Sequence, residues 1–172
     1  MPATLAANPP PLVFEGDWTW GNYPIKAAET FKPDDLVYLD SNGLLVAAAA
    51  ASASVGNVKL LGFAAGDAAR LLTQFGSGAE CPVRIPTPTS RFLMPVGHST
   101  PASAVIAAAD MDPPLTLPIA RDANGIYYAD KENNGTNDRV TCFERHPEFP
   151  FSETFGWFWW KFIHGTTLME GT

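Results

Sequence analysis

Short apolar runs alternate with turn residues along most of the chain, which is typical of a protein built from short strands. The strongest turn signals are two Asn-Gly pairs that separate apolar runs, because both residues tolerate the positive φ angles of a two-residue turn. Each pair predicts a β-hairpin. The pairs are Asn42-Gly43, between residues 36–40 and 44–47, and Asn124-Gly125, between residues 115–120 and 126–129.

Further strand-like runs follow at a spacing of about ten residues, as in small barrels and sandwiches. Two of these runs contain prolines, which cannot donate a hydrogen bond to a neighbouring strand, so we expect them at sheet edges or strand ends. The runs are residues 58–64, 81–86, 91–96 and 139–144, and the prolines belong to the second and third.

One short helix is expected over residues 102–109. Thr100 can cap its first turn, Pro101 suits the first helical position, and alanines follow. The alanine-rich stretch 47–54 is too short for a stable helix and favours a loop or a bulged strand end. Residues 68–72, after Gly66-Asp67, are compatible with a turn and a brief helical excursion.

The aromatic run 155–163 fits either a strand buried on both faces or an amphipathic helix. Its aromatic content and the internal Gly156 favour the strand. The whole pattern predicts a mainly β fold, a compact β-barrel or sandwich of short antiparallel strands with one short helix and an extended N-terminal arm. We expect the arm over residues 1–22, a barrel-like domain over 23–97 and a second β-rich part over 98–172.

Composition supports a folded protein that does not bind nucleic acid. The 172 residues are 46% hydrophobic and 17% charged, enough apolar surface to bury a core. The net charge of −7 repels phosphate backbones. The sequence shows no apolar run long enough to span a membrane and no secretory signal pattern, so we expect synthesis in a cytoplasm. Cys81 and Cys142 are expected to be reduced and structural.

No catalytic or cofactor-binding motif is present, and no cofactor or metal is expected. A Cys142 nucleophile assisted by His146 is conceivable, but Cys142 lies within an apolar strand, where the pKa of a thiol rises. Residues 130–135 resemble the first half of a calcium loop. Thr141 stands where such a loop needs a bidentate glutamate, so a solvated loop is the better interpretation.

Tryptophans concentrate near the two ends of the chain, and the N-terminus is rich in proline. Tryptophan is common in cores, in subunit interfaces and on surfaces that stack against sugars, and these three interpretations stay open. The residues considered for a protein interface are Pro9, Pro10, Pro11, Trp18, Trp20, Trp157, Trp159 and Trp160.

Several segments together resemble the capsid decoration or cement proteins of tailed bacteriophages. Those proteins usually have Gly-Asp where this chain has Asp34-Asp35, and they end in a valine-rich strand instead of an aromatic one. The similar segments are FKPDDLVYLDSNGLLVAA from residue 31, LLGFAA from residue 60, VRIPTPTSRFLMPV from residue 83, ARDANGIYYADK from residue 120 and RVTCFE from residue 139.

The resemblance implies a non-enzymatic structural protein on the outer capsid surface of a virion. Its partners would be the major capsid protein and neighbouring copies of itself, as a dimer or trimer, and it would stabilise the shell without acting on nucleic acid or membrane. A proline-rich arm and aromatic edges suit such bridging contacts, which many copies strengthen together. The alternative is a carbohydrate-binding virion or surface module that uses exposed tryptophans.

Overall fold

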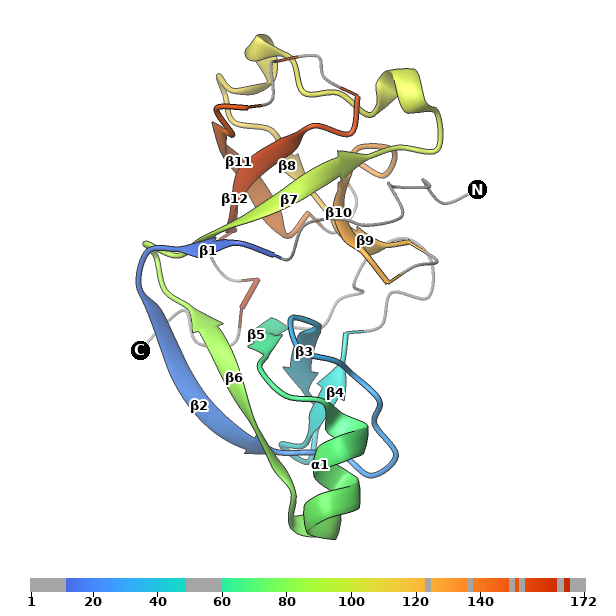
Figure 1. Ribbon diagram of the computed structural model, residues 1–172. Coiled ribbons are helices and arrows are strands. Elements are labelled where there is room, and N and C mark those ends of the chain that lie inside the picture. The colour runs from blue at the N-terminus through green and yellow to red at the C-terminus, as the bar shows by residue number, and fades with distance from the viewer. Residues whose placement is uncertain are drawn as a thin grey trace. The chain divides into compact units, whose positions relative to one another are not determined.

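The computed structural model describes residues 12–48, 60–122, 125–135, 138–148, 151, 154–163 and 166–167. They form two compact units, each built round one β-sheet (Figure 1). Unit 1 comprises the described residues of Met1–Glu15 and Arg91–Ile163. Unit 2 comprises those of Gly16–Ala49, Val58–Ser90 and His164–Thr172. The chain is mainly β, as the sequence predicts, and no helix among the described residues is long and apolar enough to cross a membrane.

The elements follow in chain order. The strands are β1 (Phe14–Glu15), β2 (Trp18–Pro24), β3 (Leu36–Leu39), β4 (Leu45–Ala47), β5 (Leu60–Ala64), β6 (Glu80–Pro86), β7 (Arg91–Gly97), β8 (Thr116–Leu117), β9 (Ile119–Arg121), β10 (Tyr127–Asp130), β11 (Val140–Arg145) and β12 (Trp157–Phe162). The helices are α1 (Ala68–Phe75) and the short 3₁₀ turns η1 (Gly76–Gly78), η2 (Pro101–Ser103) and η3 (Ala108–Asp110).

Unit 2 holds a five-stranded antiparallel sheet in the order β2-β6-β5-β3-β4. β3 and β4 form the predicted hairpin, and Gly43 in its turn has φ +74°. Just beyond β2, the amide of Lys26 donates to the carbonyl of Leu45 in β4, 3.1 Å away. The two end strands of the sheet, β2 and β4, therefore meet at this one point. The sheet therefore curls toward a barrel without closing along its length.

Unit 1 holds a seven-stranded sheet in the order β8-β11-β12-β7-β10-β9, with β1 paired to β7. β9 and β10 are antiparallel, which confirms the second predicted hairpin. Pro118 alone separates β8 from β9, so one bent segment pairs with β11 through its first half and with β10 through its second. The pairing of β7 with β10 is parallel, unlike the other pairs of this sheet.

The expectation that these prolines lie at sheet edges or strand ends holds for Pro86, the last residue of β6. It is wrong for Pro82 and Pro95, which lie inside β6 and β7, and both strands have neighbours on two sides. In β7 the amide of Leu93 donates to Val13 on the β1 side, whereas that of Val96 donates to Gly156 on the β12 side. Because alternate residues point to opposite edges, Pro95 faces the β1 side. On that side of β7, β1 pairs with residues 91–92 and β10 pairs with β7 only from Val96 onward. Pro95 therefore lies opposite the gap between these two partner strands, where no backbone donor is needed.

Among the described residues the one α-helix is α1, where the sequence predicts only a brief helical excursion. The Asp67 carboxylate accepts a hydrogen bond from the amide of Arg70 at 2.9 Å and caps the first turn. Gly76, at φ +67°, ends the helix, and its amide donates to the carbonyl of Leu72. Good capping at both ends therefore extends a short segment to two turns.

The predicted helix over residues 102–109 is wrong, because only the turns η2 and η3 form there. The carbonyl of Ala104 accepts a hydrogen bond from the amide of Phe155 at 2.8 Å, and that of Val105 accepts one from the Lys131 ammonium at 2.7 Å. A helix would use those carbonyls internally. Ala104 and Ile106 are instead buried by packing in an extended segment.

The aromatic run forms a strand, β12, as favoured from its composition. It lies between β11 and β7, and its side chains alternate between two faces. Phe158 and Trp160 point into the core of unit 1 together with their cross-strand neighbours Phe92 and Met94. The core of unit 2 consists of Ile25, Phe31, Val37, Leu45, Leu61, Ala64, Ala68, Ala79, Cys81, Val83 and Ile85.

The N-terminal region differs from the expected arm in the part that the structure describes. Residues 14–15 and 18–24 are strands, β1 in unit 1 and β2 in unit 2, so the described part of 1–22 is not an arm outside the sheets. Residues 1–11 lie outside the described residues. The two units are assembled from interleaved segments of the chain, whereas the sequence predicts the continuous ranges 23–97 and 98–172.

Ala28→Gly is expected to raise the free energy of unfolding by about 0.5–1 kcal/mol. Ala28 is exposed and has φ 65°, a left-handed conformation that costs an L-residue about 1–2 kcal/mol and glycine almost nothing. Part of this gain is offset because glycine loses more chain entropy on folding than alanine does. Urea titration measures the change. Ala69→Gly, at an exposed position within α1, is the control and is expected to lower stability by about 1 kcal/mol. Destabilisation by both substitutions would contradict the prediction.

Candidate functional site

One face of the β7-β12-β11 sheet in unit 1 carries aromatic and charged side chains instead of a closed apolar core. Trp159 of β12 lies on the face opposite to Trp160, with Lys161 two residues further along the same face. Arg91 begins β7, and Glu144 of β11 is the direct cross-strand neighbour of Trp159. We call the following set the aromatic–cation patch: Glu15, Arg91, Phe143, Glu144, Trp159 and Lys161.

A β-bulge in β11 brings Phe143 into the patch. Cys142 pairs with Trp160 and Glu144 pairs with Trp159, so Phe143 is an extra residue without a cross-strand partner of its own. Strict alternation after the buried Cys142 would turn Glu144 inward. The bulge instead leaves Phe143 and Glu144 both exposed, and 44% of Phe143 is accessible to solvent.

Arg91 is the centre of the patch, because it contacts four of the other members. Its guanidinium carbon lies 4.9 Å from the centroid of the Trp159 ring and 5.7 Å from that of the Phe143 ring. Nη1 donates to Glu144 at 2.7 Å, and Nε donates to Glu15 at 2.8 Å. The planar guanidinium suits this combination of stacking and forked hydrogen bonding, which holds its position on the sheet.

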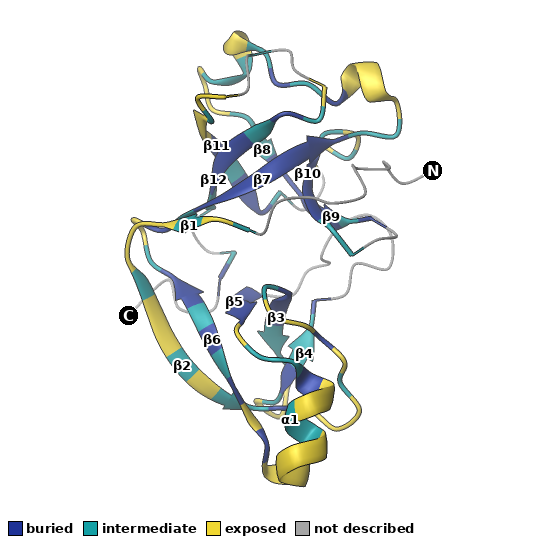
Figure 2. Cartoon of the chain, in the orientation of Figure 1, coloured by how far each residue is buried: buried dark blue, intermediate teal, exposed yellow. Residues whose placement is uncertain are grey.

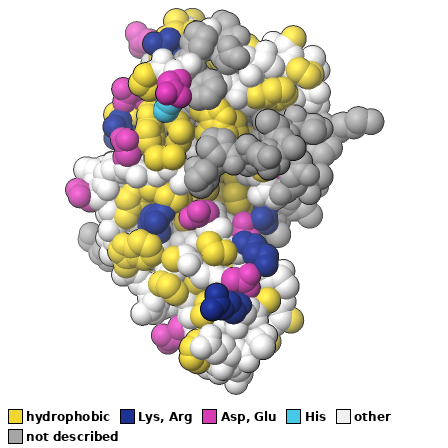
Figure 3. All heavy atoms as spheres, in the orientation of Figure 1, with side chains coloured by type: hydrophobic (Ala, Val, Ile, Leu, Met, Phe, Trp, Pro, Cys, Tyr) yellow, Lys and Arg dark blue, Asp and Glu magenta, His cyan; other side chains and the backbone are white. Residues whose placement is uncertain are grey.

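Lys161 completes the aromatic–cation patch, and His146 lies beside it. The Lys161 ammonium lies 3.9 Å from the centroid of the Phe143 ring, within the range of a cation–π interaction. The His146 ring lies 6.5 Å from the ring of Trp159. Figure 3 shows hydrophobic side chains beside basic, acidic and histidine side chains on the viewed face of the molecule. The patch thus combines an exposed aromatic ring with charges of both signs.

This arrangement is suited to binding a protein surface. Tryptophan, phenylalanine and arginine are enriched in protein interfaces, and tryptophan and arginine carry a large share of measured binding energy. A partner would meet an Arg91 side chain whose rotamers are already restricted, which reduces the entropy lost on binding. Two cations and two carboxylates balance in charge, so the patch does not favour a strongly acidic or basic partner.

The structure separates the tryptophans considered for an interface. Trp160 is fully buried, and its indole nitrogen donates to the carbonyl of Met94 at 2.9 Å, so it is a core residue. Trp159 is 6% exposed under Arg91, and Trp157 is half-buried on the same face of β12. Pro9, Pro10 and Pro11 lie outside the described residues.

Trp18 and Trp20 lie on β2 in unit 2, so the structure does not join them to the aromatic–cation patch. The half-buried Trp18 meets Phe63 edge to face, with ring centroids 6.0 Å apart. Trp20 is 54% exposed, the largest exposure among the described tryptophans. The Arg84 guanidinium lies over the Trp20 ring, 5.1 Å from its centroid, so a sugar that stacked on that face would have to displace it.

The conceivable Cys142–His146 pair is not assembled. Cys142 is completely buried, its sulfur contacts that of Met111 at 3.4 Å, and His146 accepts a hydrogen bond from the amide of Glu148. Burial raises the pKa of the Cys142 thiol to about 12. The thiol is therefore protonated at neutral pH and is a poor nucleophile.

Within the loop 130–135, the carboxylate of Asp130 is used internally, and that of Glu132 accepts a hydrogen bond from the amide of Ser99. Asp130 accepts hydrogen bonds from the amide of Glu132 at 3.0 Å and from the side-chain amide of Asn133 at 2.7 Å. In the part of the chain that the structure describes, no group of three or more His, Cys, Asp or Glu side chains could hold a metal ion. The loop geometry matches a solvated turn better than a calcium site.

Sequence reasoning missed Arg91, Phe143 and Lys161 as members of a candidate site. Arg91 and Lys161 stand 70 positions apart, and only the pairing of β7 with β12 brings their strands together. Phe143 reaches the surface through a bulge, which has no signal in the apolar run 139–144. Comparison of the chain with protein-family models, with curated proteins and with solved structures found no match.

Proposed function

We propose that this protein is a non-enzymatic structural protein of a phage virion, a decoration or cement protein that binds the outer surface of the major capsid protein shell. The observation that carries the proposal is the aromatic–cation patch, a surface with the composition of a protein-binding site on a rigid sheet. The resemblance of roughly residues 25–145 to phage decoration proteins suggests which protein it binds.

The physical requirements of a cement protein are modest, and the chain meets them. Each copy needs a stable body and a small adhesive surface, because many copies on one particle strengthen a weak individual contact. The two sheets provide the body, and the patch provides an adhesive surface. The negative net charge keeps free copies soluble and suits the outside of a particle, away from packaged DNA.

The proposal is tested by mixing the purified chain with expanded, empty shells of a candidate major capsid protein and measuring co-sedimentation. Saturable, stoichiometric binding is expected. Phe143→Ser is expected to weaken it about thirtyfold, the effect of losing an interface residue worth about 2 kcal/mol. Because Phe143 is already exposed, the substitution removes little core packing.

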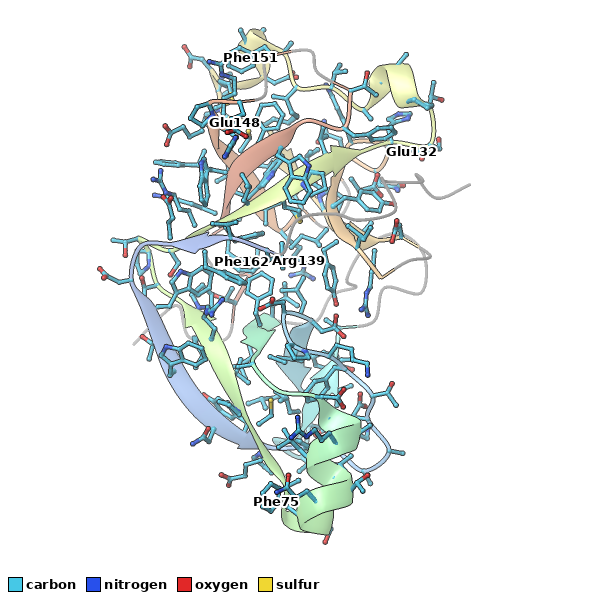
Figure 4. The ribbon with its side chains drawn as sticks, in the orientation of Figure 1. Phe75, Glu132, Arg139, Glu148, Phe151 and Phe162 are labelled. Carbon is cyan, nitrogen blue, oxygen red and sulfur yellow. The ribbon has the colours of Figure 1, made fainter. Side chains whose placement is uncertain are left out.

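Phe75→Ser is the matched control. Phe75 is 60% exposed at the end of α1, in the other unit (Figure 4). It is expected to leave shell binding unchanged. A wild-type chain that ignores shells would overturn the proposed function. Equal shell binding by the wild-type chain, Phe143→Ser and Phe75→Ser would show that the patch does not contact the shell. An equal loss of binding in the two variants would show the same.

A further inference from the structure

The outer edge of β2 offers backbone hydrogen-bonding groups to a partner. β2 is an end strand of the unit 2 sheet, and its residues are exposed or half-buried along its length (Figure 2). The amide of Ile25 donates to Ala79 on the β6 side at 2.9 Å, whereas that of Lys26 donates to Leu45 on the opposite side. Because successive residues alternate, Trp20 and Asn22 direct their backbone groups away from β6, toward the outer edge.

Over residues 18–23, this edge has none of the devices that proteins use to block strand addition. β2 has the sequence WTWGNYP, which contains no charged side chain, and its one proline is the last residue. It pairs with β6 over seven consecutive residues without a register shift, so no bulge bends it away. Trp20 and Asn22, whose backbone groups face the outer edge, are both exposed. An exposed, uncharged and regular edge is a template for another strand.

We propose that β2 pairs with β2 of a second copy of this chain, antiparallel about a two-fold axis. In the register centred on Gly21, Trp20 of one copy lies opposite Asn22 of the other, and each such pair exchanges two backbone hydrogen bonds. The two five-stranded sheets then form one continuous sheet. The two Trp20 rings lie diagonally across the new pair, within reach of each other.

A second copy is an occupant that the chain itself supplies, because the edge is self-complementary. A two-fold axis presents the same donors and acceptors in opposite directions, as an isologous interface requires. The chain carries a net charge of −7, which opposes self-association, but β2 adds no charge at the contact. Arg84 is the neighbour of Trp20 on β6, so the Arg84 residues of the two copies are three strand spacings apart, about 14 Å, and are largely screened.

The test is the mass of the purified chain by light scattering over a dilution series. The wild-type chain is expected at twice its 18.5-kDa mass. Asn22→Pro removes the outward amide donor without touching a β2–β6 hydrogen bond, and it is expected to weaken the dimer about a hundredfold because both symmetric pairs lose a bond. Asn22→Ala is the matched control. It keeps the backbone amide and is expected to remain dimeric.

Trp20→Lys provides a second variant in case proline disturbs the strand. A lysine on the edge, next to Arg84, is expected to give a monomer with an unchanged far-ultraviolet circular dichroism spectrum. A monomeric wild-type chain, or a dimer that survives in both Asn22→Pro and Trp20→Lys, would overturn the pairing. The inference does not rest on shell binding, because the patch lies in unit 1 and β2 in unit 2, and the two assays fail separately.

Discussion

Trp160→Ala is expected to lower the free energy of unfolding by about 4 kcal/mol, the range for truncating a buried aromatic side chain. Trp160 is fully buried between its cross-strand neighbours Phe92 and Cys142, both also buried. The substitution leaves a cavity and removes the hydrogen bond to the carbonyl of Met94. Urea denaturation followed by far-ultraviolet circular dichroism measures the change.

Trp20→Ala is the control for Trp160→Ala. Trp20 is 54% exposed and stacks against the half-buried Arg84 side chain, so truncation is expected to cost less than about 1 kcal/mol in a stability measurement on the monomer. Similar losses in the two variants would mean that burial does not separate these tryptophans. The same experiment tests the assignment of Trp160 to the core, which the sequence alone leaves open.

Gly62→Ala is expected to lower the free energy of unfolding by about 3 kcal/mol, near the upper end for overpacking. Gly62 lies in the middle of β5, and an added Cβ would stand 2.0 Å from the carbonyl oxygen of Arg84. That oxygen belongs to the backbone of β6, which has strands on both sides and cannot move like a flexible side chain. Relief therefore requires the separation of two paired strands.

Gly78→Ala is the matched control, because nothing lies within 4 Å of its added Cβ and its φ is not in the left-handed region. It is expected to change stability by less than about 0.5 kcal/mol. Thermal and urea denaturation of both variants give the comparison. A Gly62→Ala protein as stable as Gly78→Ala would show that β5 and β6 can shift apart at little cost.

Local chemistry accounts for the parts of the fold that sequence reasoning predicts correctly. The Asn42-Gly43 turn forms the β3–β4 hairpin, and Gly125 lies between β9 and β10 with φ +83°. Both follow from the conformational freedom of glycine, which does not depend on distant residues. The strand β12 follows from aromatic composition.

The wrong predictions concern segments whose structure depends on distant partners. Residues 102–109 have helical capping and composition, but Phe155 and Lys131 take the carbonyls that a helix needs. Pro95 is acceptable in a central strand only because its missing donor falls between β1 and β10. Neither compensation is visible in the nearby sequence.

The short strands and the glycine turns between them follow from the amino-acid sequence alone, because turn preference and side-chain alternation act over a few residues. The burial of Trp160, the exposure of Trp20 and the meeting of Arg91, Phe143 and Lys161 on one face depend on the folded arrangement of distant segments. Strand register and the bulge at Phe143 arise from pairing between segments tens of residues apart. The candidate site is therefore a property of the assembled sheet.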